Sequence, residues 1–239
     1  DGLLNLQGVE GLVIIGGGLQ VINNPAITDL SGLDSLIYVG TECLISGNDV
    51  LTSLSGLDSL EEVFGDLRIT LNDALVDFTG LGQLGYVGGD LVVEYNHGLQ
   101  DFSGLSALSE INGSLSVVVN NNLEDLSGLE ALLSIGSTLR VSANPSLTRL
   151  GGLINVTSIG QNLEVQLNVS LTQIDALENI DPASINILFI RFNDQLSVCE
   201  APTVCGFLAI PGRIAIISEN ATGCNTPAEV EANCPTILP

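Results

Sequence analysis

The sequence predicts an all-β chain, a right-handed parallel β-solenoid, because one pattern repeats along most of its 239 residues. Asparagine recurs seven times at a strict spacing of 24 residues, at Asn24, Asn48, Asn72, Asn96, Asn120, Asn144 and Asn168. Leucine or cysteine stands five residues before each asparagine, and valine or isoleucine stands three residues before it. A Gly-Leu pair recurs with the same period, from Gly32-Leu33 to Gly152-Leu153. A fixed repeat of this length is typical of solenoids, in which each coil packs on the next.

Each repeat contains one clear strand and two weaker ones. The Leu-x-[Val/Ile] step, as in Leu67-x-Ile69, alternates with period two and is β-branched, which favours a strand with two inward residues. Apolar residues then follow at a spacing of three, as in Leu54, Leu57 and Leu60, but the repeated glycine argues against a helix. We therefore expect two further short strands, three faces and about eight coils stacked about 4.8 Å apart, in a rod about 40 Å long.

The asparagine column has a structural explanation. A stacked asparagine inside a corner can bond backbone groups that the turn leaves unpaired, and can also bond the asparagine of the next coil. Cys43 occupies a leucine position of the repeat, so we expect a buried free thiol there.

The regular repeats cover 1–180, and 181–239 reads as one or more degenerate coils followed by a C-terminal cap. Four of the five cysteines fall there, at Cys199, Cys205, Cys224 and Cys234. Their spacing and the lack of a nearby histidine favour disulfides over zinc. The expected pairs are Cys199–Cys205 and Cys224–Cys234, which are local in sequence. Thr226-Pro-Ala-Glu229 is a capping box, which predicts a short helix over 227–233.

Composition narrows the choice of partner and compartment. The formal net charge is −23 and the chain contains no lysine, so an acidic surface excludes nucleic acids and anionic membranes as partners. No apolar run approaches the roughly 20 residues of a membrane span, which argues against membrane insertion. Clustered cysteines in an acidic chain indicate a disulfide-bearing protein that is secreted or held at the cell surface.

One column of the repeat carries acids. Asp77, Asp101 and Asp125 occupy equivalent positions, so stacked coils would place them about 4.8 Å apart. One interpretation is a site for Ca²⁺ or another hard cation. The other is turn chemistry, since Asp-x-[Ser/Thr]-Gly places aspartate and glycine at favoured positions of a type I turn.

No residue is predicted to be catalytic. His97, the one histidine, stacks on Asp73 in the same column, but the repeat places no activated serine or cysteine beside it. Gly16-Gly-Gly18 lacks the helix that a phosphate site needs. A polysaccharide-active β-helix enzyme remains a lesser alternative, because such enzymes need clustered acids with nearby bases and this chain has few bases.

Outward residues of the middle coils predict a binding patch. Leu71, Val92, Tyr95, Val118 and Val119 would form one exposed apolar surface, and such surfaces mark interfaces. We therefore expect a non-enzymatic extracellular recognition or adhesion module that presents a rigid face to a protein or glycan. The alternative is a structural subunit that forms a homo-oligomer or filament head to tail, since residues 1–18 show no cap-like polarity and an open solenoid end invites another chain.

The repeat resembles known families. It is similar to leucine-rich repeats, although Asn72-Asp-Ala-Leu75 has one more residue between asparagine and leucine than those repeats have. Residues 13–180 match better the coils of receptor L domains, I-x-G-x-L-x-I-x-x-N-x-x-L-x-x-L. The tail motifs Leu196-Ser-Val-Cys199 and Asn220-Ala-Thr-Gly-Cys224-Asn225 look like the ending of secreted leucine-rich-repeat-like proteins of Bacteroidetes, after which a type IX secretion sorting domain often follows. The resemblance implies a surface-associated or adhesive protein and supplies no catalytic residues.

Overall fold

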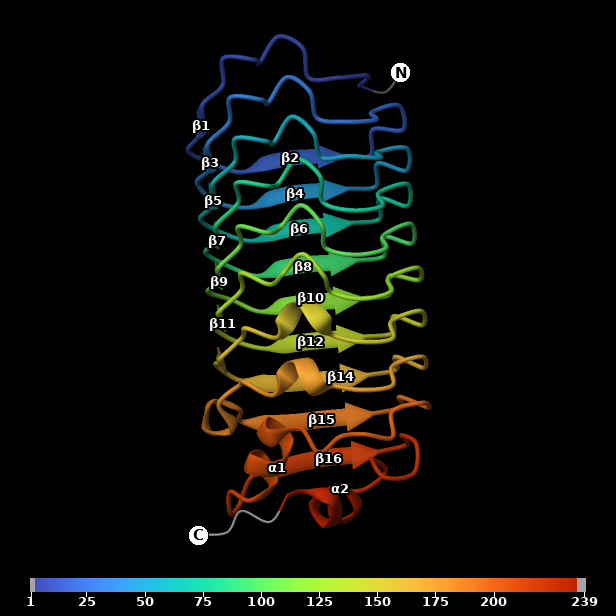
Figure 1. The fold of residues 1–239 in the computed structure, drawn as a ribbon. Coiled ribbons are helices and arrows are strands. Elements are labelled where there is room, and N and C mark those ends of the chain that lie inside the picture. Colours follow the sequence, from blue (N-terminus) through green and yellow to red (C-terminus); the bar gives the residue numbers. More distant parts are fainter. Residues whose placement is uncertain (1–2, 236–239) are drawn as a thin grey trace.

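A computed structural model describes residues 3–235 and shows a rod of stacked parallel coils with its described ends at opposite tips (Figure 1). The rod contains two parallel sheets, one of nine strands and one of seven. The predicted all-β parallel solenoid is confirmed. The nine-stranded sheet gives one coil more than the eight expected, because two strands of the C-terminal region join it.

The long strands follow the Leu-x-[Val/Ile] step of each repeat. They are β2 (Leu19–Ile22), β4 (Cys43–Ser46), β6 (Leu67–Thr70), β8 (Leu91–Glu94), β10 (Leu115–Val118), β12 (Leu139–Ser142), β14 (Asn162–Gln166), β15 (Ile187–Arg191) and β16 (Ile214–Ser218). Neighbours pair in register, so Leu91 lies opposite Leu115 and Val93 opposite Val117. These inward side chains are fully buried and stack in columns along the rod.

The second sheet consists of strands of two residues each. They are β1 (Ile14–Ile15), β3 (Tyr38–Val39), β5 (Glu62–Val63), β7 (Tyr86–Val87), β9 (Glu110–Ile111), β11 (Ser134–Ile135) and β13 (Ser158–Ile159). The second residue of each strand from β3 to β13 is buried, and the first faces outward. This face is therefore one of the two further strands that the sequence predicts.

The third side of the coil was predicted as a strand, and that prediction is wrong. Leu57 N–H donates to the Leu54 carbonyl at 3.0 Å and Leu60 N–H donates to the Leu57 carbonyl at 2.9 Å. These i→i+3 bonds form successive tight turns, which bring every third side chain inward. In two later coils the same segment forms the 3₁₀ helices η1 (Gly151–Leu153) and η2 (Asp175–Leu177). The glycine column serves these turns: Gly56 has φ +105°, and a Cβ there would lie 2.1 Å from the Leu30 carbonyl oxygen.

The asparagine ladder is confirmed, and it continues through Asn193 and Asn220. Asn72 N–H donates to Oδ1 of Asn96 at 3.0 Å. Nδ2 of Asn96 donates to the carbonyls of Ile69 at 2.8 Å and Glu94 at 3.2 Å. Each buried amide thus satisfies the backbone of its own corner and of the coil before it, which explains why no other side chain replaces it.

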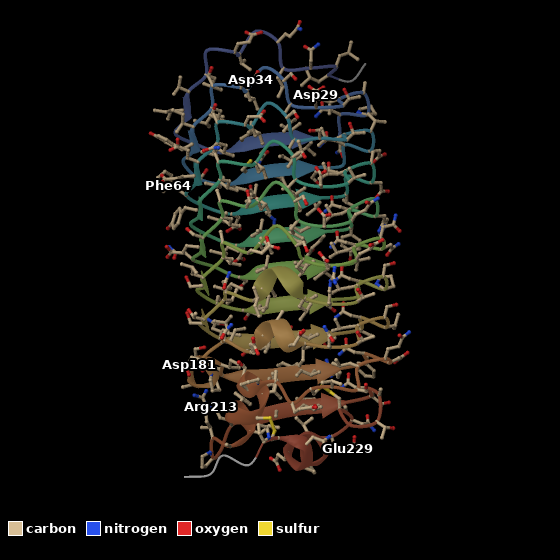
Figure 2. The ribbon with its side chains drawn as sticks, viewed as in Figure 1. Asp29, Asp34, Phe64, Asp181, Arg213 and Glu229 are labelled. Carbon is tan, nitrogen blue, oxygen red and sulfur yellow. A yellow bond between two sulfur atoms is a disulfide. The ribbon has the colours of Figure 1, made fainter. Side chains whose placement is uncertain are left out.

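Among the described residues, three further helices lie in the C-terminal region, where the repeat fails. They are η3 (Pro182–Ser184), α1 (Pro202–Leu208) and α2 (Pro227–Asn233), the last of which the capping box predicts with the same bounds. Thr226 Oγ1 accepts from Glu229 N–H at 3.2 Å, while the Glu229 carboxylate accepts from Gly223 and Asn225 N–H rather than from Thr226. Helix α1 was not predicted. Figure 2 shows Arg213 at this end of the rod, where its guanidinium binds the Ala183 and Ile185 carbonyls.

The predicted disulfide pairing is wrong. The bonds are Cys199–Cys224 and Cys205–Cys234, with Cα–Cα distances of 5.5 Å and 5.7 Å. The partners lie 25 and 29 residues apart, close to one turn of the rod, because the cap continues the stacking of the coils. Proximity in this fold follows the coil period, not the sequence separation. Cys43 is free and buried, as expected, and burial, followed by the charge of Glu42, raises the pKa of its thiol to about 12.

Candidate functional site

The residue before every ladder asparagine adopts the left-handed conformation. This position follows the end of each long strand, at the corner beyond the arrowheads in Figure 1. Its φ lies between +55° and +68° in all nine coils, at Asn23, Gly47, Leu71, Tyr95, Val119, Ala143, Leu167, Phe192 and Glu219. The turn that aims the ladder amide inward therefore requires this backbone conformation in every coil.

Six consecutive coils place an apolar side chain at this position. We call these residues the corner ridge: Leu71, Tyr95, Val119, Ala143, Leu167 and Phe192. Leu71, Tyr95, Leu167 and Phe192 are 51%, 44%, 48% and 40% exposed, while Val119 and Ala143 are half-buried. Because the coils stack at the strand spacing, the ridge runs along the rod for five steps of about 4.8 Å.

The fold itself does not need apolar groups at the corner ridge. Gly47 and Asn23 fill the same position in the first coils, and these are the residue types that tolerate a positive φ. Other residues cost about 1–2 kcal/mol each in this conformation. A β-branched residue such as Val119 is an outlier there. Strained residues that also expose apolar surface are characteristic of interaction sites.

The structure divides the five residues of the predicted binding patch. Leu71, Tyr95 and Val119 belong to the corner ridge. Val92 and Val118 are only 5% and 9% exposed, so the expectation that they form part of an exposed patch is wrong. Both are short side chains on the outer face of the long sheet, and Val92 lies beside Arg68 on β6 in a shallow groove lined by longer polar side chains.

The aspartate column serves the turns. Oδ1 of Asp77, Asp101 and Asp125 accepts from the N–H two residues later, at 2.8, 2.8 and 2.7 Å respectively. Asp29 makes the same bond to Ser31. Within residues 3–235, no group of three or more His, Cys, Asp or Glu side chains is placed to hold a metal ion. This geometry favours the turn interpretation of the column and does not carry the calcium hypothesis further.

Asp125 differs from the others because a cation faces it. Arg149 on the next coil donates from Nε at 3.0 Å and from Nη2 at 2.9 Å to Asp125 Oδ2. Burial raises the pKa of this carboxyl, but the bonds from Ser127 and the Arg149 guanidinium outweigh it, and the net pKa lies below the ordinary 3.8. At Asp29, bonds from Ser31 lower the pKa in the same direction.

His97 does not form the Asp–His contact that its column suggested. Its backbone N–H donates to Asp73 Oδ1 at 3.3 Å, and the buried ring atom Nδ1 has no hydrogen-bond partner among the described residues. The geometry therefore gives this imidazole no orienting carboxylate.

A groove of about 600 Å³ lies on the outer face of the short sheet, where no site was predicted. We call it the aromatic groove. It is lined by Glu61, Glu62, Phe64, Gln83, Gly85, Tyr86, Ser109 and Glu110. The ring of Phe64 meets Tyr38 and Tyr86 edge-on, with centroids 5.6 Å and 6.3 Å apart. In Figure 2, Phe64 projects from the edge of the rod opposite the arrowhead corner.

A sequence signal for this groove exists. The chain has only nine aromatic residues, and Tyr38 and Tyr86 share one column two coils apart. Phe64 stands one coil and two residues after Tyr38, which places it beside that column. A scan of the outward columns for aromatic residues would have found it.

Comparisons with protein families, curated proteins and solved structures found no match for this chain. The likeness to leucine-rich repeats and receptor L domains therefore rests on the sequence pattern. In the described part of the chain, no helix has the length and apolar character needed to cross a membrane.

Proposed function

We propose that this protein is an extracellular, non-enzymatic recognition or adhesion module that binds a partner protein along the corner ridge. The observation that carries the proposal is the ridge itself: six successive coils present apolar side chains on a strained backbone, although glycine and asparagine fit the same position elsewhere. A long rigid row of apolar groups suits a protein partner, which can bury them together.

Two further observations support this class. The structure contains two disulfides, and such bonds persist mainly in oxidising compartments outside the cytosol. The pattern over 13–180 resembles receptor L domains, and the tail resembles secreted leucine-rich-repeat-like proteins of Bacteroidetes, so we place the chain with these as part of the proposal.

The test replaces ridge residues without disturbing the backbone. The triple variant Leu71→Asn, Tyr95→Asn, Leu167→Asn keeps a residue type that accepts positive φ. The matched control is Ile37→Asn, Val76→Asn, Leu133→Asn, which removes three exposed apolar side chains elsewhere. We expect wild type and control to bind at least one protein on an array of purified extracellular proteins and the ridge variant to lose that binding. Binding to glycans alone, or equal loss in both variants, would contradict the proposal.

One observation favours a second candidate, head-to-tail filaments. The first described coil exposes Leu3, Leu4, Val9 and Ile14, and β2 pairs on one side only. An apolar pocket of about 510 Å³ lies between Leu3, Val9 and the residues of β2. Light scattering and negative-stain microscopy distinguish the candidates: fibres that vanish when residues 1–18 are deleted support filaments, and monodisperse monomers at micromolar concentration exclude them.

A further inference from the structure

We propose that the aromatic groove binds arginine side chains from an extended, basic segment of a partner protein. This site lies on the short sheet, on a different face from the corner ridge, and its occupancy does not depend on the proposal made for the ridge. The argument rests on the order of side chains along the sheet, the arrangement of the rings and the charge of the groove.

Aromatic and acidic residues alternate along the outer face of four neighbouring short strands. Tyr38 on β3 lies opposite Glu62 on β5, Glu62 opposite Tyr86 on β7, and Tyr86 opposite Glu110 on β9. The backbone of each glutamate thus lies one strand spacing, about 4.8 Å, from the backbone of a tyrosine. A cation placed over either ring would have a carboxylate beside it.

The rings are held in place. Phe64 is 49% exposed and meets both tyrosines edge-on, at interplanar angles of 88° and 63°. Nδ2 of Asn112 donates to the Tyr86 hydroxyl at 2.6 Å, which fixes the outer end of that ring. Aromatic faces attract cations, and arginine is the cation found there most often.

The groove has no cation of its own. None of the arginines in residues 3–235 lies within 4.0 Å of the Glu61, Glu62 or Glu110 carboxylates; three of the five instead pair with acids elsewhere, at Arg68, Arg140 and Arg149. Neighbouring carboxylates repel one another unless a positive group lies between them. The net charge of −23 adds to the attraction for a basic partner.

Arginine fits this surface better than lysine or a neutral sugar. Its planar guanidinium can stack on a ring and donate two bonds to a neighbouring carboxylate at once, which an ammonium group cannot do. A neutral sugar could stack on the rings, but would leave the carboxylate charges unbalanced. The groove is also open, so an extended segment can cross it.

The test is a titration of the ¹⁵N-labelled protein, followed by NMR, in 150 mM NaCl. The probe is an acetylated and amidated Gly-Arg-Gly-Arg-Gly peptide, with Gly-Lys-Gly-Lys-Gly and Gly-Gln-Gly-Gln-Gly as controls. We expect saturable shifts confined to β5, β7, β9 and their flanks, weaker binding of the lysine peptide and none of the glutamine peptide.

Variants separate the groove from attraction to the overall charge. Phe64→Ala leaves the charge unchanged and should weaken binding about threefold to fivefold, whereas Val76→Ala, which shortens an exposed apolar side chain outside the groove and the corner ridge, should leave it unchanged. The double variant Glu62→Gln, Glu110→Gln should weaken binding about fivefold. The control Glu124→Gln, Glu178→Gln removes the same charge from exposed sites outside the groove and should have less than about a 1.5-fold effect.

Three results would overturn the proposal. Unchanged binding by Phe64→Ala would mean that net charge alone attracts the peptide, and so would equal weakening by the two glutamate double variants. Saturable shifts at the same strands with a neutral oligosaccharide such as cellohexaose, without shifts from the arginine peptide, would show a carbohydrate site. None of these results bears on protein binding by the corner ridge, which the ridge variants test separately.

Discussion

The regular coils and the C-terminal cap are held together in different ways. In the coils, the same contacts recur every 24 residues, and each ladder asparagine completes the hydrogen bonding of the coil before it. In the cap, the ladder continues through Asn193 and Asn220, but two α-helices and two disulfides accompany it. Repetition suffices where every coil has two like neighbours, whereas the last coils have one like neighbour and need additional bonds.

The largest expected effect comes from removing a ladder asparagine in the middle of the rod, compared with removing the first asparagine of the ladder. Asn96→Ala removes the acceptor of the Asn72 N–H and the donor to the Ile69 carbonyl, so we expect a loss of about 3–5 kcal/mol in the free energy of unfolding. Asn24 is partly exposed and has no earlier ladder residue, so Asn24→Ala should cost less than about 1 kcal/mol. Urea unfolding measures both values, and equal losses would show that the ladder is not cooperative along the rod.

The second test removes a covalent bond from the cap. Replacing Cys205 and Cys234 with serine should lower stability by about 2–4 kcal/mol, because the unfolded chain regains freedom. We expect faster amide hydrogen exchange in β16, α1 and α2, with β4 to β10 unaffected. Peptide mapping without reduction checks the pairing first: a 199–205 linkage would contradict the structure.

The third test concerns strain at the corner ridge. Val119→Gly removes the backbone strain of a valine in the left-handed conformation, but it also raises the entropy of the unfolded chain. We therefore expect the free energy of unfolding to increase by about 0.5–1 kcal/mol. The same substitution should weaken partner binding. A loss of stability instead would mean that the valine side chain supports the coil, and the strain argument for the ridge would fail.

The fourth test is electrostatic. The pKa of Asp125 is lowered in the folded state, so its charge contributes stability above the unfolded value of 3.8, and this contribution is lost as the pH falls through the lower folded value. Asp125→Asn keeps the Ser127 bond but loses attraction to Arg149, and should cost less than about 1 kcal/mol at pH 7. The difference from wild type should shrink as the pH falls below 3.8 and disappear once the pH is below the folded pKa. A difference that persists at pH 2 would indicate a packing effect.

The smallest expected effect tests the calcium hypothesis. Because Asp77, Asp101 and Asp125 each cap a turn, we expect CaCl₂ and NaCl at equal ionic strength to raise the melting temperature equally. A larger rise in calcium that Asp101→Asn abolishes would restore the metal site.

Sequence pattern predicted the coils well and the cap poorly, for a physical reason. The Asn96 column and the Leu91–Val93 step recur often enough to fix register, inward face and strand direction. The third side was mistaken for a strand because inward spacing does not distinguish a strand from successive turns; the i→i+3 bonds from Leu54 to Leu60 decide it. Cys199 and Cys224 do not belong to a column of cysteines that recurs in the regular coils. The sequence pattern therefore does not show that the cap still follows the coil period.

The repeat pattern also predicts only part of the candidate surfaces. Leu71 and Tyr95 were recognised as outward, because position in the repeat determines direction. The burial of Val92 depends on the length of the side chains beside it, which the repeat does not encode. The aromatic groove combines Tyr38 and Tyr86 from one column with Phe64 from another, so no single column of the repeat reveals all three rings together.

Because the ladder repeats in the same way in every regular coil, the rod can lose or gain whole coils. Removing 24 residues from within the regular coils, such as 97–120, would join Asn96 to a segment in the same phase and leave each remaining amide with a partner of the same kind. The rod would become shorter by one step of about 4.8 Å, with its two tips unchanged. Length is therefore a property that duplication and loss of whole coils can adjust in fixed increments of one coil.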